Sequence, residues 1–280
     1  MKILVTGVNG QLGHDVVAEL SVREISCKGV DISDFDLTNE AAVSEYIREY
    51  APDAVVHCAA FTAVDKAEEA KELAFSVNVT GTENVARACK EISAKMVYIS
   101  TDYVFPGEGE TPYEVSDKQG PKGYYGYTKL MGEEKVKEYL TDYFIVRTAW
   151  VFGVNGNNFV KTMLRLGKEK PSLTVVCDQF GSPTYCPDLA FLLCDMVVTD
   201  RFGTYHATNE GFISWAEFAT EIMQQAGLAT KIIPVSSEEY ASKAVRPKNS
   251  RLSKSSLDAA GFTRLPPWQD ALARYMNELQ

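Results

Sequence analysis

The sequence predicts an α/β protein built on a doubly wound parallel sheet, with a smaller C-terminal lobe. Three observations support this fold class. Over the first 150 residues, short apolar runs alternate with longer segments of helical periodicity, which is the pattern of repeated βαβ units. Several runs are almost continuously apolar, as expected for strands that helices cover on both faces. A glycine-rich turn follows the first run and opens a helical segment.

The elements follow in order along the chain. Strands are predicted at Lys2–Thr6, Glu24–Val30, Ala54–Cys58, Met96–Ser100 and Phe144–Arg147, and helices at Gln11–Leu20, Glu40–Tyr50, Asp65–Ile92 with a break, and Tyr125–Leu140. After Trp150 we expect helices at Phe159–Gly167, Pro187–Val198, Trp215–Ala226 and Pro267–Leu279, and one strand at Thr174–Cys177. No flexible linker separates the halves. Residues 1–150 are therefore expected to form the sheet domain and 151–280 mainly a substrate-binding lobe, with about 185–207 returning to the first domain.

Composition and charge exclude several classes of protein. Acidic residues outnumber basic ones by 38 to 28, so nucleic acid, which draws on clustered Lys and Arg, is not an expected partner. The sequence has no run near the roughly 20 apolar residues of a membrane span, and its opening apolar run is too short for a secretory signal. We therefore expect a cytoplasmic protein without a membrane partner.

Cysteine and histidine give no indication of a metal site. The six cysteines include no Cys-x-x-Cys pair, and we interpret them as small buried residues in a reducing compartment. The three histidines are spread along the chain, which leaves little material for a zinc site or a Ser-His-Asp triad. The sequence therefore predicts no metal-binding residue.

The glycine-rich turn predicts a dinucleotide site. Gly7 permits a tight turn, Gly10 allows the backbone to approach a pyrophosphate, and Gly13 allows the helix to lie close to the strand. Gln11 and Leu12 lie in the first turn of that helix, whose free N–H groups face the anion. The spacing is the G-x-x-G-x-x-G variant, which is weak alone and is strengthened by its place between a strand and a helix.

Acidic residues after the second strand bear on the choice of cofactor. Asp31 lies eighteen residues past Gly13, where a carboxylate can accept hydrogen bonds from the adenosine ribose. Its charge disfavours a 2′-phosphate and therefore favours NADH over NADPH, although Lys28 lies close by. Asp36, with Leu37, either meets the adenine or caps the helix that begins at Glu40.

Tyr125 and Lys129 lie four residues apart on one face of a predicted helix. A neighbouring ammonium favours the phenolate, so such a pair can exchange a proton with a carbonyl or hydroxyl oxygen. The helix follows the fourth strand, and its N-terminal end is expected near the strand ends that a cofactor occupies. Thr101, at the end of that strand, is the third predicted catalytic residue, because its hydroxyl can bond the same substrate oxygen.

With these residues in place, the chain resembles the extended short-chain dehydrogenase/reductase family, and within it the subfamily that reduces dTDP-4-dehydrorhamnose. The segments that resemble the family follow its order along nearly the whole chain. They are residues 5–13, 59–68, 100–107, 125–133, 147–152, 156–159, 178–184 and 246–252. Thr62 through Glu68, Thr101 through Gly107 and Asp178 through Thr184 are the segments most specific to the subfamily.

The resemblance implies a Rossmann fold and reduction of the 4-keto group of dTDP-4-dehydro-L-rhamnose to dTDP-L-rhamnose with NADH or NADPH. Tyr125 would donate a proton to the ketone oxygen, Lys129 would hold the nicotinamide ribose and lower the tyrosine pKa, and Thr101 would orient the ketone. Asn78 would support the lysine through water. The implied cofactor contacts are Gly7, Gly10, Gln11, Leu12, Gly13, Asp31, Asp36, Leu37, Ala59, Ala60, Phe61 and Thr62, and the implied substrate contacts are Val64, Thr101, Asp102, Tyr103, Trp150 and Asn158.

Two departures from the family pattern bear on partners. Phe61 stands where relatives often carry histidine, which removes any polar side-chain contact at that position. Some relatives form a dimer bridged by a divalent metal through glutamates, and the matching residues here are Asp15, Asp188 and Glu278. Two of the three are shortened to aspartate, so Mg²⁺ and the choice between monomer and homodimer both stay open.

Three alternatives compete with this interpretation. A 4,6-dehydratase or 4-epimerase would share the glycine turn and the Tyr/Lys pair, but the dehydratase needs a glutamate where this chain has Tyr103. A non-catalytic NAD(P)-binding regulatory subunit would be indicated by loss of Tyr125 or Lys129, and both are present. A reductase of another 4-keto deoxysugar nucleotide is the remaining alternative, because one sequence does not rank the sugars.

Overall fold

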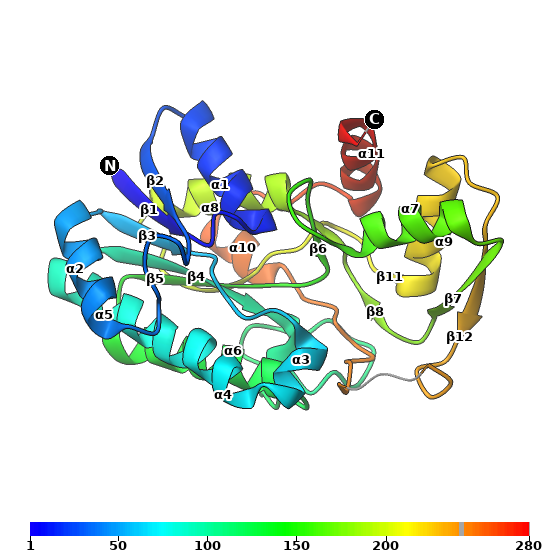
Figure 1. Ribbon diagram of the computed structural model, residues 1–280, viewed down its shortest axis with the longest axis horizontal. Helices are drawn as coiled ribbons and strands as arrows, with labels where there is room; N and C mark the ends of the chain where they lie inside the picture. The colour runs from blue at the N-terminus through cyan, green and yellow to red at the C-terminus, as the bar shows by residue number, and fades with distance from the viewer. Residues whose placement is uncertain (241–243, 280) are drawn as a thin grey trace.

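A six-stranded parallel sheet forms the centre of the protein (Figure 1). The computed structural model describes residues 1–240 and 244–279. The strands lie in the order β10-β5-β4-β3-β1-β2, so the chain winds outward from β1 in both directions and confirms the predicted doubly wound fold. Their bounds are β1 Lys2–Thr6, β2 Ser26–Val30, β3 Ala54–His57, β4 Lys95–Thr101, β5 Tyr143–Thr148 and β10 Gly203–His206.

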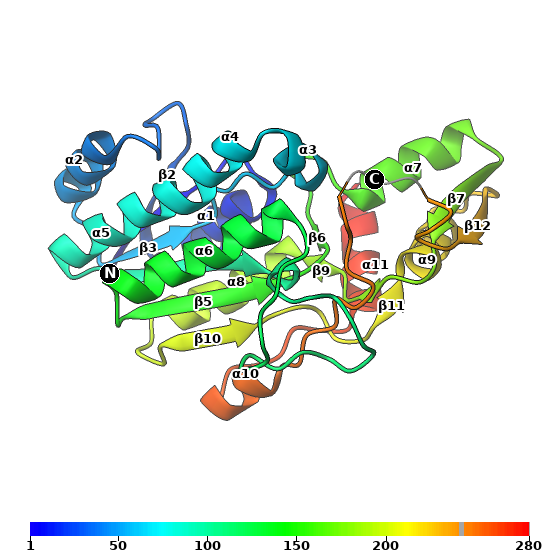
Figure 2. The ribbon, with the colours of Figure 1, turned by 90° about the horizontal axis from the view of Figure 1, so that it is seen from below.

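Helices cover both faces of the sheet, which explains why its strands are apolar on both sides (Figure 2). Along β1, Ile3 and Val5 point into one core and Leu4 into the other, as the two-residue period of a strand requires. The first core is closed by α1 (Gln11–Val22), α8 (Cys186–Val197) and α10 (Ser255–Ala260). The second is closed by α2 (Glu40–Tyr50), α5 (Thr82–Ile92) and α6 (Tyr124–Tyr139).

The long helical segment after β3 is broken, as the sequence predicts. It consists of α3 (Val64–Glu69), α4 (Lys71–Phe75) and a π-helical turn, Ser76–Gly81, before α5. The break falls at Ala70, whose backbone leaves the helical region with φ −105° and ψ 53°. The π-helical turn carries Asn78.

The C-terminal lobe has its own hydrophobic core. Helices α7 (Phe159–Glu169), α9 (Trp215–Gln225) and α11 (Trp268–Glu278) pack there with the pair β7 (Ser172–Val176) and β12 (Lys231–Val235). Two short pairs link the lobe to the sheet domain, β6 (Val151–Phe152) with β9 (Thr184–Tyr185), and β8 (Phe180–Gly181) with β11 (Ile213–Ser214). Strand β10 and helices α8 and α10 belong to the sheet domain although they follow the start of the lobe.

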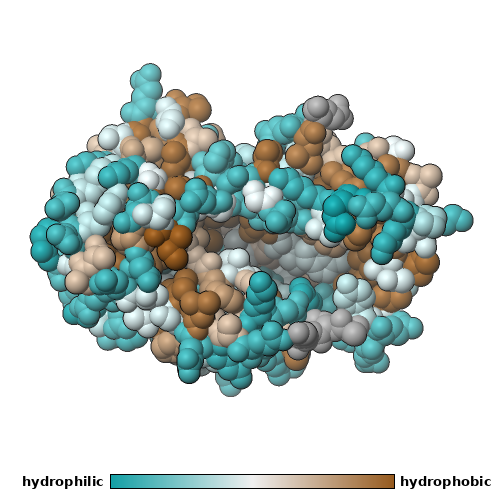
Figure 3. All heavy atoms as spheres, in the orientation of Figure 1, coloured by the Kyte–Doolittle hydropathy of each residue, from teal (hydrophilic) through white to brown (hydrophobic). Residues whose placement is uncertain are grey.

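The carboxyl ends of the central strands face the lobe, and the molecule is hollowed between the two (Figures 1 and 3). This hollow is the place where open α/β sheets bind their ligands. Among the described helices, none is long and apolar enough to cross a membrane.

Candidate active site

A cavity of about 800 Å³ occupies the hollow at the strand ends. It brings together the residues predicted for the site except Phe61, Asn78 and Asn158, which do not line it. Its walls include the following predicted residues: Gly7, Gly10, Gln11, Leu12, Gly13, Asp31, Asp36, Leu37, Ala59, Ala60, Thr62, Val64, Thr101, Asp102, Tyr103, Tyr125, Lys129 and Trp150. Segments separated by more than a hundred residues therefore converge on one site.

The glycine turn has the geometry of a phosphate cradle. Gly7 adopts a positive φ of 74°, and a Cβ added there would lie 2.7 Å from the Cα of Ala59. A Cβ on Gly13 would lie 2.3 Å from the carbonyl oxygen of Gly7, so only glycine lets α1 approach the turn this closely. Helix α1 begins after Gly10 without a side-chain cap, which leaves its first N–H groups directed at the cavity. These residues fit a dinucleotide pyrophosphate.

The two acidic residues after β2 have different roles. The carboxylate of Asp31 accepts hydrogen bonds from the backbone N–H groups of Asn9 (2.9 Å) and Ile32 (2.8 Å), which fix it beside the glycine turn. Asp36 accepts from the backbone and hydroxyl of Thr38, both at 2.8 Å. The expectation that Asp36 caps α2 is wrong, because Asn39 is the N-cap and accepts from Ala42 N at 3.2 Å.

Tyr125 lies beside Thr101 at the carboxyl end of β4. The Thr101 hydroxyl lies close enough to the Tyr125 phenol to act on its pKa, and the ring of Tyr103 packs edge-on against Tyr125 with centroids 5.5 Å apart. Burial, with the carboxylate of Asp102 nearby, raises the pKa of Tyr125 above its usual range. Desolvation of the phenolate is the main cause of this upward shift, and a lowering of the pKa by Lys129 stays a prediction.

Lys129 is 3% exposed and its ammonium lies 4.1 Å from the centre of the Tyr98 ring. Burial lowers the pKa of Lys129 to about 7, while the carboxylate of Glu133, one helical turn further along α6, acts in the opposite direction. The Tyr98 hydroxyl donates to the backbone oxygen of Lys129 at 3.2 Å, which links α6 to β4. The site therefore holds an ammonium that titrates close to neutrality.

Asn78 ties the loop after β3 to the catalytic helix. Its side-chain oxygen accepts from the backbone N–H of Phe61 at 2.7 Å, and its amide group donates to the Phe61 oxygen (3.1 Å) and the Thr128 hydroxyl (3.0 Å). The side chain thus positions the residue next to Lys129. A water bridge from Asn78 to the lysine stays a prediction.

Asp102 offers the site a free hydrogen-bond acceptor. The residue is 3% exposed, and its Oδ1 accepts from the Thr101 hydroxyl at 2.9 Å. Its Oδ2 is buried and has no hydrogen-bond partner among the described residues. Burial raises the pKa of Asp102 to about 6. A buried carboxylate oxygen without a donor is costly, so this atom indicates a ligand that brings one.

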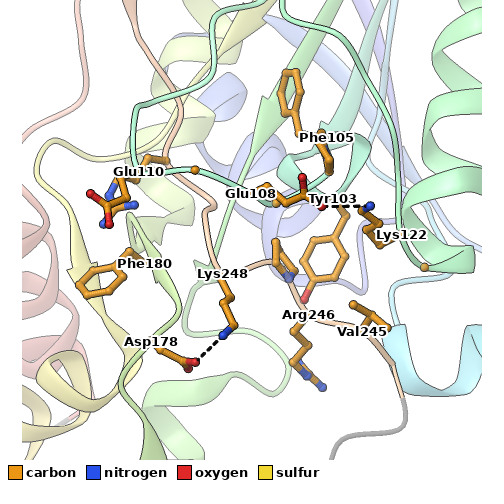
Figure 4. A pocket seen from close by; sticks show the side chains of 16 residues that line it. Tyr103, Phe105, Glu108, Glu110, Lys122, Asp178, Phe180, Val245, Arg246 and Lys248 are labelled. Atoms are coloured by element: carbon orange, nitrogen blue, oxygen red, sulfur yellow. Dashed lines mark ion pairs between the residues drawn. The ribbon is translucent and has the colours of Figure 1, made fainter. Parts of the chain in front are cut away.

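A second cavity, of about 620 Å³, shares the Tyr103 wall with the first (Figure 4). Two ion pairs lie in its wall, Lys248 with Asp178 at 3.2 Å and Lys122 with Glu108 at 3.1 Å, as the dashed lines show. Arg246, which also lines it, pairs with Asp65 of α3 at 2.8 Å. Arg246 and Lys248 belong to residues 246–252, one of the segments in which the sequence resembles the family.

Two residues of the site differ from the sequence prediction. Asn158 does not line the cavity: its amide donates to Gln11, to the backbone oxygen of Gly153 and to Tyr275, and its Oδ1 caps α7. It positions Gln11, and its contact with substrate stays a prediction. Trp215 lines the cavity and was not predicted. The Ser214/Glu217 capping box marks the helix start in the sequence, but nothing local indicates which way the indole points.

Two of the three acids implied as metal ligands have strong partners, whereas Asp15 contacts His14 at 3.1 Å through Oδ1 and its buried Oδ2 has no hydrogen-bond partner among the described residues. Asp188 accepts from Arg274 and Asn209, both at 2.7 Å, and Glu278 accepts from the Tyr185 hydroxyl at 2.6 Å. No group of three His, Cys, Asp or Glu side chains arranged for a metal ion is found within residues 1–240 and 244–279. Arg274 already neutralises Asp188, and the metal bridge stays a prediction.

The glycine cradle, the Tyr/Lys pair and the strand-end threonine in one cavity define a dinucleotide-binding oxidoreductase of the short-chain dehydrogenase/reductase class. Comparison with known proteins narrows the class. Over residues 1–280 the chain matches the family described as RmlD substrate binding domain, and it belongs to this family.

Individual relatives cover the full chain. A dTDP-4-dehydrorhamnose reductase of Clostridium acetobutylicum has a crystal structure with TM-score 0.98 and 43% identity, covering 100% of both chains. One of Bacillus anthracis, in complex with NADP, has TM-score 0.97 and 44% identity, covering 99% of this chain and 100% of that one. The spore coat polysaccharide biosynthesis protein SpsK of Bacillus subtilis is 41% identical over 99% of this chain and 97% of its own length.

Proposed function

We propose that the protein reduces the 4-keto group of dTDP-4-dehydro-L-rhamnose to give dTDP-L-rhamnose, as part of dTDP-rhamnose and polysaccharide biosynthesis. The observation that carries the proposal is the Tyr125–Thr101 contact at the end of β4, in the same cavity as the glycine cradle. The reductases of Clostridium acetobutylicum and Bacillus anthracis, whose names state this activity, support the choice of substrate.

The chemistry divides between cofactor and protein. The bound nicotinamide supplies hydride, which adds to the carbonyl carbon at C4. Tyr125 supplies the proton that the carbonyl oxygen takes up, and its raised pKa keeps the phenol neutral and ready to donate. The protonated Lys129 then offsets the negative charge left on the phenol oxygen. Thr101 holds the ketone oxygen within reach of the phenol, and solvent returns the proton to Tyr125.

The sugar nucleotide would span both cavities. The free Oδ2 of Asp102 accepts a hydrogen bond from a sugar hydroxyl, which satisfies the buried carboxylate. Beyond Tyr103, the second cavity takes the nucleoside diphosphate, and its cations Lys122, Arg246 and Lys248 turn from their acidic partners toward the phosphates. This division lets a protein of net charge −10 bind an anion through local charges.

Asp31 supports NADH as the preferred cofactor, because its fixed carboxylate repels a 2′-phosphate. Lys28 does not offset that repulsion, since its ammonium lies over the ring of Tyr46 at 4.7 Å. The Bacillus anthracis relative binds NADP, so both cofactors belong in the test. We place the reaction in the cytoplasm, in keeping with the six free thiols. We propose that the protein is a monomer or a homodimer.

The test mixes the purified protein with dTDP-4-dehydro-L-rhamnose and follows NADH or NADPH absorbance in separate reactions. We expect oxidation with the wild type and a loss of at least about a hundredfold in kcat for Tyr125→Phe, which lacks the proton donor. Other 4-keto deoxysugar nucleotides serve as competing substrates. Faster turnover of one of these would replace the sugar in the proposal, and no turnover of any, with wild type and Tyr125→Phe alike, would leave a non-catalytic binding protein.

A further inference from the structure

Two tryptophans stack on each other where the sheet domain meets the C-terminal lobe. Trp150 follows β5, where the chain leaves the sheet, and Trp215 is the first residue of α9 in the lobe. Their ring centroids lie 3.6 Å apart with an interplanar angle of 15°, and both rings line the cavity of about 800 Å³. The stack therefore forms an apolar part of the wall of a cavity that the polar residues Thr101, Asp102 and Tyr125 also line.

The backbone of Trp150 needs outside support to hold this place. Its φ is 51°, in the left-handed region that bulky residues rarely adopt, so the surrounding structure must impose it. Its carbonyl oxygen accepts from Thr184 N at 3.1 Å, which fixes the chain but not the direction of the indole. The stack with Trp215 supplies that direction.

One small sheet positions both neighbours of the Trp150 ring. In the pair β8–β11, Gly181 is opposite Ile213, and Ser214 leads directly into Trp215. A Cβ placed on Gly181 would lie 2.8 Å from Cε2 of Trp150, so the indole fits only because this residue is glycine. The capping box between Ser214 and Glu217 fixes the first turn of α9 and with it the start of the Trp215 side chain.

Trp215 is also connected, through neighbouring residues, to the glycine turn of the predicted cofactor site. Phe159 packs against the Trp215 ring with centroids 4.5 Å apart. It follows Asn158, whose amide donates to the side chain of Gln11 in the glycine turn at 3.0 Å. Trp215 thus contacts Trp150 directly and is connected through Phe159 and Asn158 to Gln11 in the first turn of α1.

We propose that Trp215 is a positioning residue for the reaction, and that it holds Trp150 as the flat apolar wall against which the C–H face of the deoxysugar lies. Indole rings bind the apolar faces of partly polar ligands in this way. Because the wall is built from the sheet domain and the C-terminal lobe together, its geometry contributes to binding of the sugar. The inference rests on the proposed function and deepens it.

The test compares Trp215→Ala, Trp215→Phe and Gly181→Ala with the wild type. Stacked indoles couple electronically and give a couplet in circular dichroism. We expect Trp215→Ala to lose the couplet and to raise KM for the sugar nucleotide about tenfold, with kcat changed less than about threefold and KM for NADPH or NADH unchanged. Trp215→Phe keeps an aromatic face and should restore most of the KM. Gly181→Ala displaces Trp150 without removing a ring, so it should raise the same KM.

Trp268→Phe is the matched control. Trp268 is 5% exposed in the lobe core and packs on Phe218, with centroids 5.7 Å apart, outside the stack. It should keep both the couplet and the KM. The inference is overturned if Trp215→Ala loses the couplet at unchanged KM, or if it raises the KM of sugar and cofactor equally. A wild type that oxidises neither cofactor with any 4-keto sugar nucleotide would overturn the proposed function and this inference together.

Discussion

Replacing Glu133 by glutamine removes the negative charge of the most buried ion pair near the site. Glu133 is 0% exposed and Arg147 1% exposed, and they form two parallel bonds of 2.8 Å and 2.7 Å. The Ser100 hydroxyl donates a third bond to the same carboxylate at 2.6 Å. The variant leaves the Arg147 guanidinium buried without its counterion, a change that typically costs about 3–5 kcal/mol.

The loss can be converted into a melting temperature. Unfolding entropy is about 2.1 cal/mol/K per residue near 60 °C, or about 0.6 kcal/mol/K for 280 residues, so Tm should fall by about 5–8 °C. Calorimetry or circular dichroism measures this directly. Glu134→Gln is the matched control, because Glu134 is half-exposed and pairs only at the surface with Lys137, which predicts a shift near zero.

The same variant should move the pH dependence of the reaction. Catalysis needs the Lys129 ammonium, which is present below its pKa of about 7 and is lost as pH rises through that value. Glu133 raises this pKa, so its replacement should shift the fall in kcat/KM for the cofactor, a parameter of the free enzyme, to lower pH. An unchanged Tm together with an unchanged profile would refute both the burial and the charge argument.

Three further predictions address single contacts. Asp102→Asn should raise KM for the sugar nucleotide about tenfold and leave KM for the cofactor unchanged, because the free Oδ2 acceptor is lost; equal effects on both would contradict it. Asp31→Ala should increase the ratio of kcat/KM for NADPH over NADH, and a constant ratio would remove Asp31 from cofactor selection. Gly13→Ala should weaken cofactor binding at least about tenfold in a fluorescence titration, since its Cβ would meet the Gly7 oxygen, whereas Gly120→Ala, with its nearest neighbour at 3.9 Å, should bind normally.

Local patterns were enough to predict the sheet and the cofactor side of the site. The run at Lys2–Thr6 has three consecutive apolar residues at its centre and is followed by the glycines at fixed spacing, so neighbouring residues carry the whole signal. Tyr125 and Lys129 lie four residues apart on one helix, and the helix is placed by the strand before it. Such features do not depend on contacts from distant parts of the chain.

Features that depend on distant partners could not be predicted. Strand β10 is four residues long, contains glycine and histidine, and becomes a strand only through its pairing with β5. The contact of Trp150 with Trp215 joins residues 65 apart in the sequence, and neither position carries a periodic signal. The pKa of Tyr125 is raised chiefly because the whole fold buries the phenol, and this burial is not visible in the spacing of Tyr125 and Lys129.

Hydride transfer tests the central claim most directly. The enzyme is given dTDP-4-dehydro-L-rhamnose and a cofactor carrying deuterium at the transferred position of the nicotinamide ring, and the product is examined by nuclear magnetic resonance. The account predicts deuterium bonded to C4 of the product sugar with the wild type, and almost none with Tyr125→Phe in the same time. A product without deuterium at C4, or labelling equal in the two proteins, would contradict it.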